Sequence, residues 1–187
     1  RGLWEYRHKD YEKCAKILEE SSKVRKREDR YYNMAVNCYI FLKQHDNLMT
    51  LVDKGLRALP EHVKLNTANA YLSYIKDDPE GVLQKLAAFT KNKELVYDFD
   101  IHRLLVWAYC RKNNPKRVDL NLKKLRLTKI DEKNLEDAVY LIEFLLDNHC
   151  LDETYAFLDK LHKHFPEKDL SDLYRRIQGL MLEEVNQ

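Results

Sequence analysis

The chain has 187 residues, 33 basic and 31 acidic side chains, and a formal net charge of +2. Four glycines and four prolines are too few for a turn-rich all-β fold or for a glycine-rich phosphate-binding loop. No apolar run approaches the roughly 18 residues of a membrane-spanning helix, and the first residues lack the apolar core of a signal peptide.

The predicted elements are all helices, because apolar residues recur three and four positions apart. Leu48, Val52 and Leu59 show this spacing in one clear stretch. Four stretches of this kind are predicted helices: 46–59, 79–89, 115–127 and 152–165. Pro79 and Pro115 open two of them, at the position where a helix tolerates a missing N–H.

A short phrase, in which a small residue is followed by tyrosine, recurs ahead of these helices. Its copies end at Tyr39, Tyr71 and Tyr109, and a weaker copy ends at Leu145. The intervals are 32, 38 and 36 residues, and a short polar break separates each copy from the next helix. The pattern predicts a helix–turn–helix unit that repeats along the chain.

The repeat resembles the tetratricopeptide motif, a helix–turn–helix of about 34 residues with the pattern W-x2-L-G-x2-Y, A-x3-F and P. The second unit carries the best match, with Tyr32, Ala35 and Tyr39 in its first helix and Pro60 at its end. Gly55 stands where the family has a small alanine. Most of the family's turn glycines are absent, and a pentatricopeptide or HEAT-like helical array is the alternative.

The resemblance implies an all-α fold: a right-handed superhelix of about five antiparallel helix hairpins, a tetratricopeptide-like α-solenoid, with a C-terminal capping helix. The predicted units are 1–28, 29–61, 62–96, 97–131 and 132–167, followed by a final helix over 168–187. Together they form a single repeat domain. The chain lacks an initiator Met, so we expect this domain to be a fragment of a longer protein.

The resemblance also implies that the first helix of each unit lines a concave groove, where this family binds peptides. Helix phase assigns nine residues to the groove: Asn33, Asn37, Asn69, Arg103, Trp107, Arg111, Val139, Glu143 and Asp147. Asn37 and Asn69 occupy equivalent places, and a side-chain amide there can bond to a ligand backbone because it both donates and accepts. The alternative is a solvated groove wall or a hydrogen bond between repeats.

Arg103, Trp107 and Arg111 are four residues apart, so they share one helix face. Such a ladder can hold an acidic or aromatic peptide through charge-assisted hydrogen bonds and cation–π contacts. The alternative places Trp107 in the core, with the two arginines solvated at its rim.

Charge is unevenly distributed along the chain. Residues 103–129 contain nine basic side chains and one acidic side chain, whereas residues 131–159 contain nine acidic side chains and one lysine. The basic segment suits an acidic partner segment, with nucleic acid as the smaller alternative. The other interpretation is that each patch is a solvated helix face neutralised by its neighbours.

The predicted function is a protein–protein interaction scaffold or adaptor that binds a peptide or helix of a partner protein. No HExxH, GxSxG or Walker lysine is present, so we expect no enzyme activity, no metal site and no cofactor. Two alternatives stay open: a helical repeat that binds nucleic acid or another anion through residues 103–129, and a non-catalytic accessory region of a larger enzyme or complex. Self-association is left open.

The four cysteines are Cys14, Cys38, Cys110 and Cys150, and no CxxC pair occurs. Each lies in a predicted helical hairpin, so we expect buried, reduced thiols. Reduced thiols and the missing signal core together predict a cytoplasmic or nuclear protein.

Overall fold

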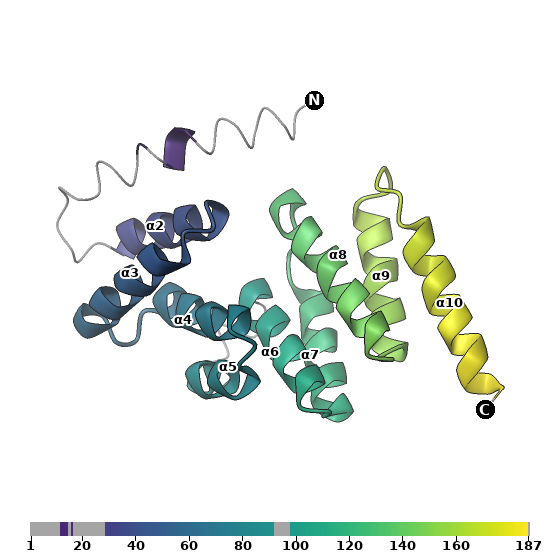
Figure 1. The fold of residues 1–187 in the computed structure, drawn as a ribbon. Helices are drawn as coiled ribbons and strands as arrows, with labels where there is room; N and C mark the ends of the chain where they lie inside the picture. The colour runs from purple at the N-terminus through teal and green to yellow at the C-terminus, as the bar shows by residue number, and fades with distance from the viewer. Residues whose placement is uncertain (1–11, 15, 17–28, 92–97, 187) are drawn as a thin grey trace. The chain divides into compact units, whose positions relative to one another are not determined.

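The computed structural model describes residues 12–14, 16, 29–91 and 98–186, and every regular element in them is an α-helix (Figure 1). The predicted all-α class is therefore confirmed. The chain divides after Asp77 into two compact units, which we call unit 1 and unit 2 and describe separately. The first predicted repeat, 1–28, lies almost entirely outside the described residues.

Unit 1 contains three described helices longer than one turn: α2 (Asp29–Phe41), α3 (His45–Ala58) and α4 (Val63–Ile75). Each of them packs against the other two. Their buried faces form one hydrophobic cluster of Tyr32, Val36, Leu48, Val52, Leu65, Ala68 and Leu72. The apolar spacing that predicts helices thus also identifies the side chains that hold unit 1 together.

Gly55 allows α3 and α4 to approach closely. A Cβ atom at this position would lie 2.5 Å from Cδ1 of Leu65 and 2.9 Å from Cε1 of Tyr32. Even the alanine of the family pattern would therefore require these neighbours to move.

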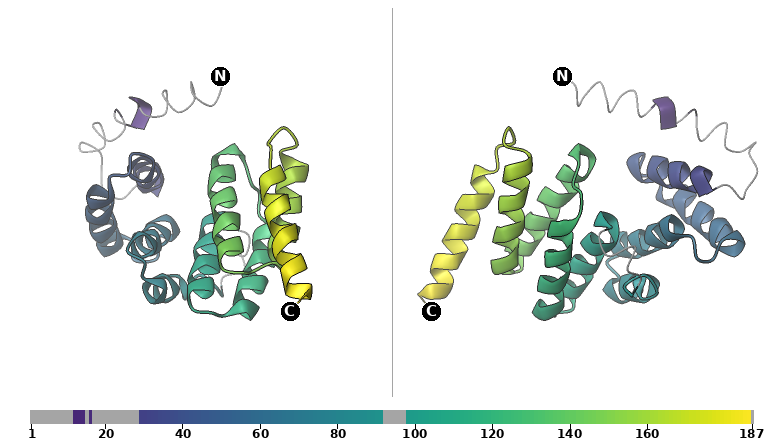
Figure 2. Two further views of the ribbon diagram at one scale, coloured as in Figure 1. Left: turned by 45° about the vertical axis from the view of Figure 1, so that its right-hand side comes forward. Right: turned by 180° about the vertical axis from the view of Figure 1, so that it is seen from behind.

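Unit 2 contains six helices in its described residues: α5 (Pro79–Leu86), α6 (Phe99–Arg111), α7 (Pro115–Leu127), α8 (Glu132–Asp147), α9 (Asp152–His164) and α10 (Ser171–Val185). Helix α6 packs against α5, α7 and α8, while α9 packs against α7, α8 and α10 (Figures 1 and 2). Helix α8 also contacts α10. One hydrophobic cluster runs from Phe99 in α6 to Ile177 in α10 and includes Phe157.

The predicted helix boundaries agree closely with the observed ones. Helices α3, α7 and α9 match their predicted ranges to within one residue at each end, whereas α5 ends at Leu86, three residues early. Pro79 and Pro115 are the first residues of α5 and α7, as expected. Just before them, Asp78 and Asn114 cap these helices, because their side-chain oxygens accept hydrogen bonds from the backbone three residues ahead.

The same turn recurs between helices. Among the described residues, four that are not glycine have a positive φ, between 51° and 55°: Lys43, Asp77, Asn113 and His149. They are 34, 36 and 36 residues apart. At the third turn, Asn113 N donates to Cys110 O and Asn114 N donates to Tyr109 O, both at 3.0 Å, which is the Schellman pattern of a helix C-terminus. The turn persists although the glycine that favours this conformation is absent.

The cysteines differ between the units. Cys14 and Cys38 form a disulfide in unit 1, with 5.2 Å between their Cα atoms. The prediction of reduced thiols is therefore wrong for this pair, because spacing along the chain does not reveal that the two residues meet in space. Cys110 and Cys150 in unit 2 are free thiols. Disulfides are rare in cytosolic proteins, so the cytoplasmic or nuclear location remains a prediction.

Candidate functional site

The predicted groove residues of unit 1 lie on α2 and α4, two helices that contact each other. Asn37 is exposed on α2, whereas Asn33 on α2 and Asn69 on α4 are half-buried. The two asparagines that the repeat places in equivalent positions are thus on neighbouring helices of one unit. Their role in binding remains a prediction.

The predicted ladder on α6 is mostly covered. Trp107 is only 7% exposed, which favours the alternative that places its indole in the core. The side chain of Arg103 is 14% exposed and lies 3.7 Å from Asp100 and 3.8 Å from Asp137. Arg111, at the last turn of α6, is exposed. Of the three ladder residues, Arg111 is the exposed one, while Trp107 is buried and Arg103 lies beside two carboxylates.

Helix α8 presents a different face, which we call the α8 stripe: Glu136, Tyr140, Glu143 and Asp147. These residues are four, three and four positions apart, so they line one side of the helix. All four are exposed, and Tyr140 is 60% exposed. Glu143 and Asp147 are predicted groove residues, whereas Glu136 and Tyr140 were missed. Tyr140 is the larger omission. Its position three residues before Glu143, inside the acidic segment, is the signal that could have found it.

Ion pairs fix α8 between its neighbours. Asp137 pairs with Arg103 of α6, and Asp147 pairs with Arg176 of α10. Burial raises the pKa of Asp137, and the nearby Arg103 opposes this shift. The middle of the α8 stripe, around Tyr140 and Glu143, lies between these two anchor points and faces solvent.

The basic segment is partly neutralised by its surroundings. Glu153 of α9 accepts ion pairs from Lys123 at 3.4 Å and from Arg126 at 3.1 Å, and Lys112 pairs with Glu80 at 3.1 Å. These contacts favour the interpretation of a helix face neutralised by its neighbours.

A lysine of α9 secures the end of α7. Lys160 donates hydrogen bonds to the carbonyls of Arg126 and Thr128, the latter at 2.7 Å. Burial lowers the pKa of Lys160, and the charge of Arg126 lowers it further. The ammonium group donates to carbonyls that a helix C-terminus leaves without an intrahelical partner. This lysine therefore stabilises the end of α7.

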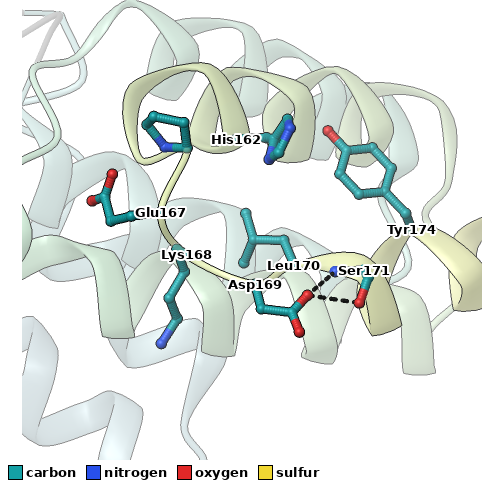
Figure 3. A pocket seen from close by; sticks show the side chains of 8 residues that line it. His162, Glu167, Lys168, Asp169, Leu170, Ser171 and Tyr174 are labelled. Atoms are coloured by element: carbon teal, nitrogen blue, oxygen red, sulfur yellow. Dashed lines mark hydrogen bonds between the residues drawn. The ribbon is translucent and has the colours of Figure 1, made fainter.

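A depression of about 370 Å³ lies at the turn between α9 and α10 (Figure 3). His162 lines it from α9 and Tyr174 from α10, with 5.8 Å between their ring centroids. Oδ1 of Asp169 accepts hydrogen bonds from the backbone N and the hydroxyl of Ser171, at 3.0 and 2.6 Å. These bonds lower the pKa of Asp169. The carboxylate therefore secures the start of α10.

Within the described ranges, no three His, Cys, Asp or Glu side chains are placed to hold a metal ion together. None of the described helices combines the length and apolar character that crossing a membrane requires. No protein-family model matches the chain, and neither a curated protein nor a solved structure matches it significantly.

Proposed function

We propose that this chain is a non-catalytic protein-interaction scaffold built as a tetratricopeptide-like array. The observation that carries the proposal is the left-handed turn that recurs at intervals of 34, 36 and 36 residues. This interval is close to the period of about 34 residues that defines the family. Along the chain the turn lies between α2 and α3, between α4 and α5, between α6 and α7, and between α8 and α9.

The packing in unit 2 supports the same proposal. Helix α6 contacts α8, and α8 contacts α10, so the first helices of successive hairpins lie next to one another. Helix α7 contacts α9, so the second helices do the same. Stacked hairpins bury the apolar stripes that a single hairpin leaves uncovered. A right-handed superhelix of about five hairpins and a binding surface on the first helices are parts of this proposal.

The α8 stripe is the proposed binding surface of unit 2, and its chemistry selects a basic partner segment. Carboxylates flank Tyr140 on both sides along the helix, and they attract Lys and Arg side chains. The exposed phenol ring offers a face for a cation–π contact. Tyrosine is also enriched among the residues that dominate binding energies.

The test is selection of random peptides displayed on phage against the full chain. Fluorescence anisotropy then measures the affinity of the chain for labelled copies of the enriched peptides. We expect enriched peptides to carry Lys or Arg. Tyr140→Ala and Glu143→Lys should each weaken binding by about tenfold, the effect of losing about 1.4 kcal/mol of contact energy. Leu127→Ala is the matched control, because Leu127 is 66% exposed on α7.

Two outcomes would contradict the proposed surface. One is enrichment of acidic peptides whose binding ignores both α8 variants. The other is binding of random-sequence RNA with affinity that falls steeply as salt rises, because counterion release of this kind would favour the basic segment 103–129.

A further inference from the structure

Two thiols of unit 2 lie close together although 40 residues separate them in sequence. The Sγ atoms of Cys110 and Cys150 are 3.8 Å apart. Cys110 belongs to the last turn of α6 and is 6% exposed, whereas Cys150 lies between α8 and α9 and is more accessible. The sulfurs touch without a covalent bond.

The repeated turn explains why these cysteines meet. The carbonyl of Cys110 accepts a hydrogen bond from Asn113 N, and Cys150 N donates to the carbonyl of Leu145, each at 3.0 Å. Both cysteines therefore belong to the same kind of helix C-terminal cap, one at the end of α6 and the other at the end of α8. Because α6 packs against α8, the two caps bring their sulfurs together.

We propose that Cys110 and Cys150 form a redox-active dithiol, which a low-molecular-weight disulfide such as oxidised glutathione converts to an intramolecular disulfide. This modification site is independent of the α8 stripe. The disulfide would join the last turn of α6 to the turn between α8 and α9.

The surroundings give the two sulfurs different roles. Either sulfur can donate in the hydrogen bond between Cys110 and Cys150. When Cys150 is the thiolate, Cys110 donates to it, and this bond lowers the pKa of Cys150. The same bond, together with burial, raises the pKa of Cys110. Arg111 opposes the pKa shift at Cys110, whereas burial and then the charge of Asp119 oppose the pKa shift at Cys150. Cys150 is thus both the better thiolate and the more accessible sulfur, as an attacking cysteine requires.

The reaction proceeds in two exchange steps. The Cys150 thiolate attacks one sulfur of oxidised glutathione, the glutathione S–S bond breaks, and a glutathione thiolate leaves. Cys110 then attacks Cys150 Sγ in this mixed disulfide, and its proton passes to the second departing glutathione. The first glutathione thiolate takes up the proton that Cys150 lost on becoming a thiolate. Two protein thiols are thus oxidised and one small disulfide is reduced to two thiols, so electrons and protons balance.

The test incubates the full chain in glutathione buffers of increasing oxidised fraction, followed by acid quenching, alkylation and peptide mass mapping. As the oxidised fraction rises, we expect the alkylated fraction of Cys110 and that of Cys150 to fall together. The two residues should then appear in one disulfide-linked peptide pair. In Cys110→Ser, glutathione should remain on Cys150, because no second thiol resolves the mixed disulfide. In Cys150→Ser, Cys110 should take up much less glutathione.

The Cys14–Cys38 disulfide of unit 1 provides an internal reference for the extent of oxidation. The proposal is overturned if Cys110 and Cys150 remain free thiols, and are therefore still alkylated after quenching, in buffers that fully form the Cys14–Cys38 bond. It is also overturned if oxidation links Cys110 or Cys150 only between two copies of the chain. Equal glutathione uptake by the two serine variants would contradict the assigned roles.

Discussion

The two compact units use the same left-handed turn between helices but secure their helices in different ways. Unit 1 combines a close approach at Gly55, where a Cβ would lie 2.5 Å from Leu65, with the Cys14–Cys38 disulfide. Unit 2 has a cluster of aliphatic and phenylalanine side chains that extends through α6, α7, α8, α9 and α10, and its two cysteines are free.

This difference separates what the repeat specifies from what each interior adds. The turn and the helix period recur in both units, so they are properties of the repeat. Each unit buries an apolar cluster of its own. In unit 1 the close approach at Gly55 and the Cys14–Cys38 disulfide add to that burial, whereas the two cysteines of unit 2 are free. Each substitution should therefore change the free energy of unfolding of one unit only. Whether it stabilises or destabilises that unit depends on the side chains packed around the substituted position.

The largest expected effect is Phe157→Ala in α9. Phe157 is completely buried in the core of unit 2, so truncation removes apolar contacts and leaves a cavity. We expect the free energy of unfolding of unit 2 to fall by about 3–5 kcal/mol. Hydrogen exchange with mass spectrometry should show lost protection in α8, α9 and α10, with unchanged protection in α3 and α4.

Leu127→Ala is the control for this substitution, because Leu127 is 66% exposed on α7 of the same unit. It should change stability by less than about 0.5 kcal/mol. Equal loss of protection in α3 and α4 of the Phe157→Ala variant would show that both units unfold as one, and the comparison between them would then fail.

The next largest effect is Gly55→Ala in α3 of unit 1. Alanine favours a helix by about 1 kcal/mol over glycine, but here its Cβ would contact Leu65 and Tyr32 at 2.5 and 2.9 Å. Overpacking costs about 1–3 kcal/mol, so we expect a net loss of about 1 kcal/mol. Urea unfolding monitored by circular dichroism measures this loss.

Gly179→Ala in α10 is the matched control in unit 2, because nothing lies within 4 Å of its added Cβ. Only the helix preference acts there, so this variant should gain about 0.5–1 kcal/mol. If both substitutions stabilise the protein equally, the close approach at Gly55 does not constrain unit 1.

The helices were predictable because their signals are local. Apolar spacing and the prolines at 79 and 115 place α5 and α7, and polar breaks mark the turns. The Cys14–Cys38 disulfide was not predictable, since it depends on which helix faces meet. Gly55 was predicted to be a small-residue position, but its need for no side chain at all follows only from the positions of Leu65 and Tyr32.

The candidate site was predictable only in part. Helix phase places Glu143 on an exposed face, and that face also contains Tyr140. The same phase rule assigns Trp107 to the groove, where it is in fact 7% exposed. Phase gives the direction of a side chain around its own helix, whereas burial depends on neighbouring helices. The pairing of Arg103 with Asp137, on another helix, is likewise a tertiary contact.

The smallest expected effect is the pH dependence that Asp137 of α8, the partner of Arg103, contributes to the stability of unit 2. Burial raises the pKa of Asp137, so the folded state keeps this proton at pH values where the unfolded chain, with a pKa near 3.8, has lost it. The free energy of unfolding should therefore fall as pH rises above 3.8 and through the folded pKa.

Asp137→Asn should lack this part of the pH dependence, and comparison of urea unfolding curves of the two proteins across that range measures it. Asp119 also has a raised pKa, through burial and the charge of Glu153, but it is present in both proteins, so their difference isolates Asp137. Identical pH profiles would mean that Arg103 compensates fully for the burial of Asp137. The Arg103–Asp137 ion pair would then make no pH-dependent contribution to the free energy of unfolding. The contact between α6 and α8 would depend on the packing of the two helices alone.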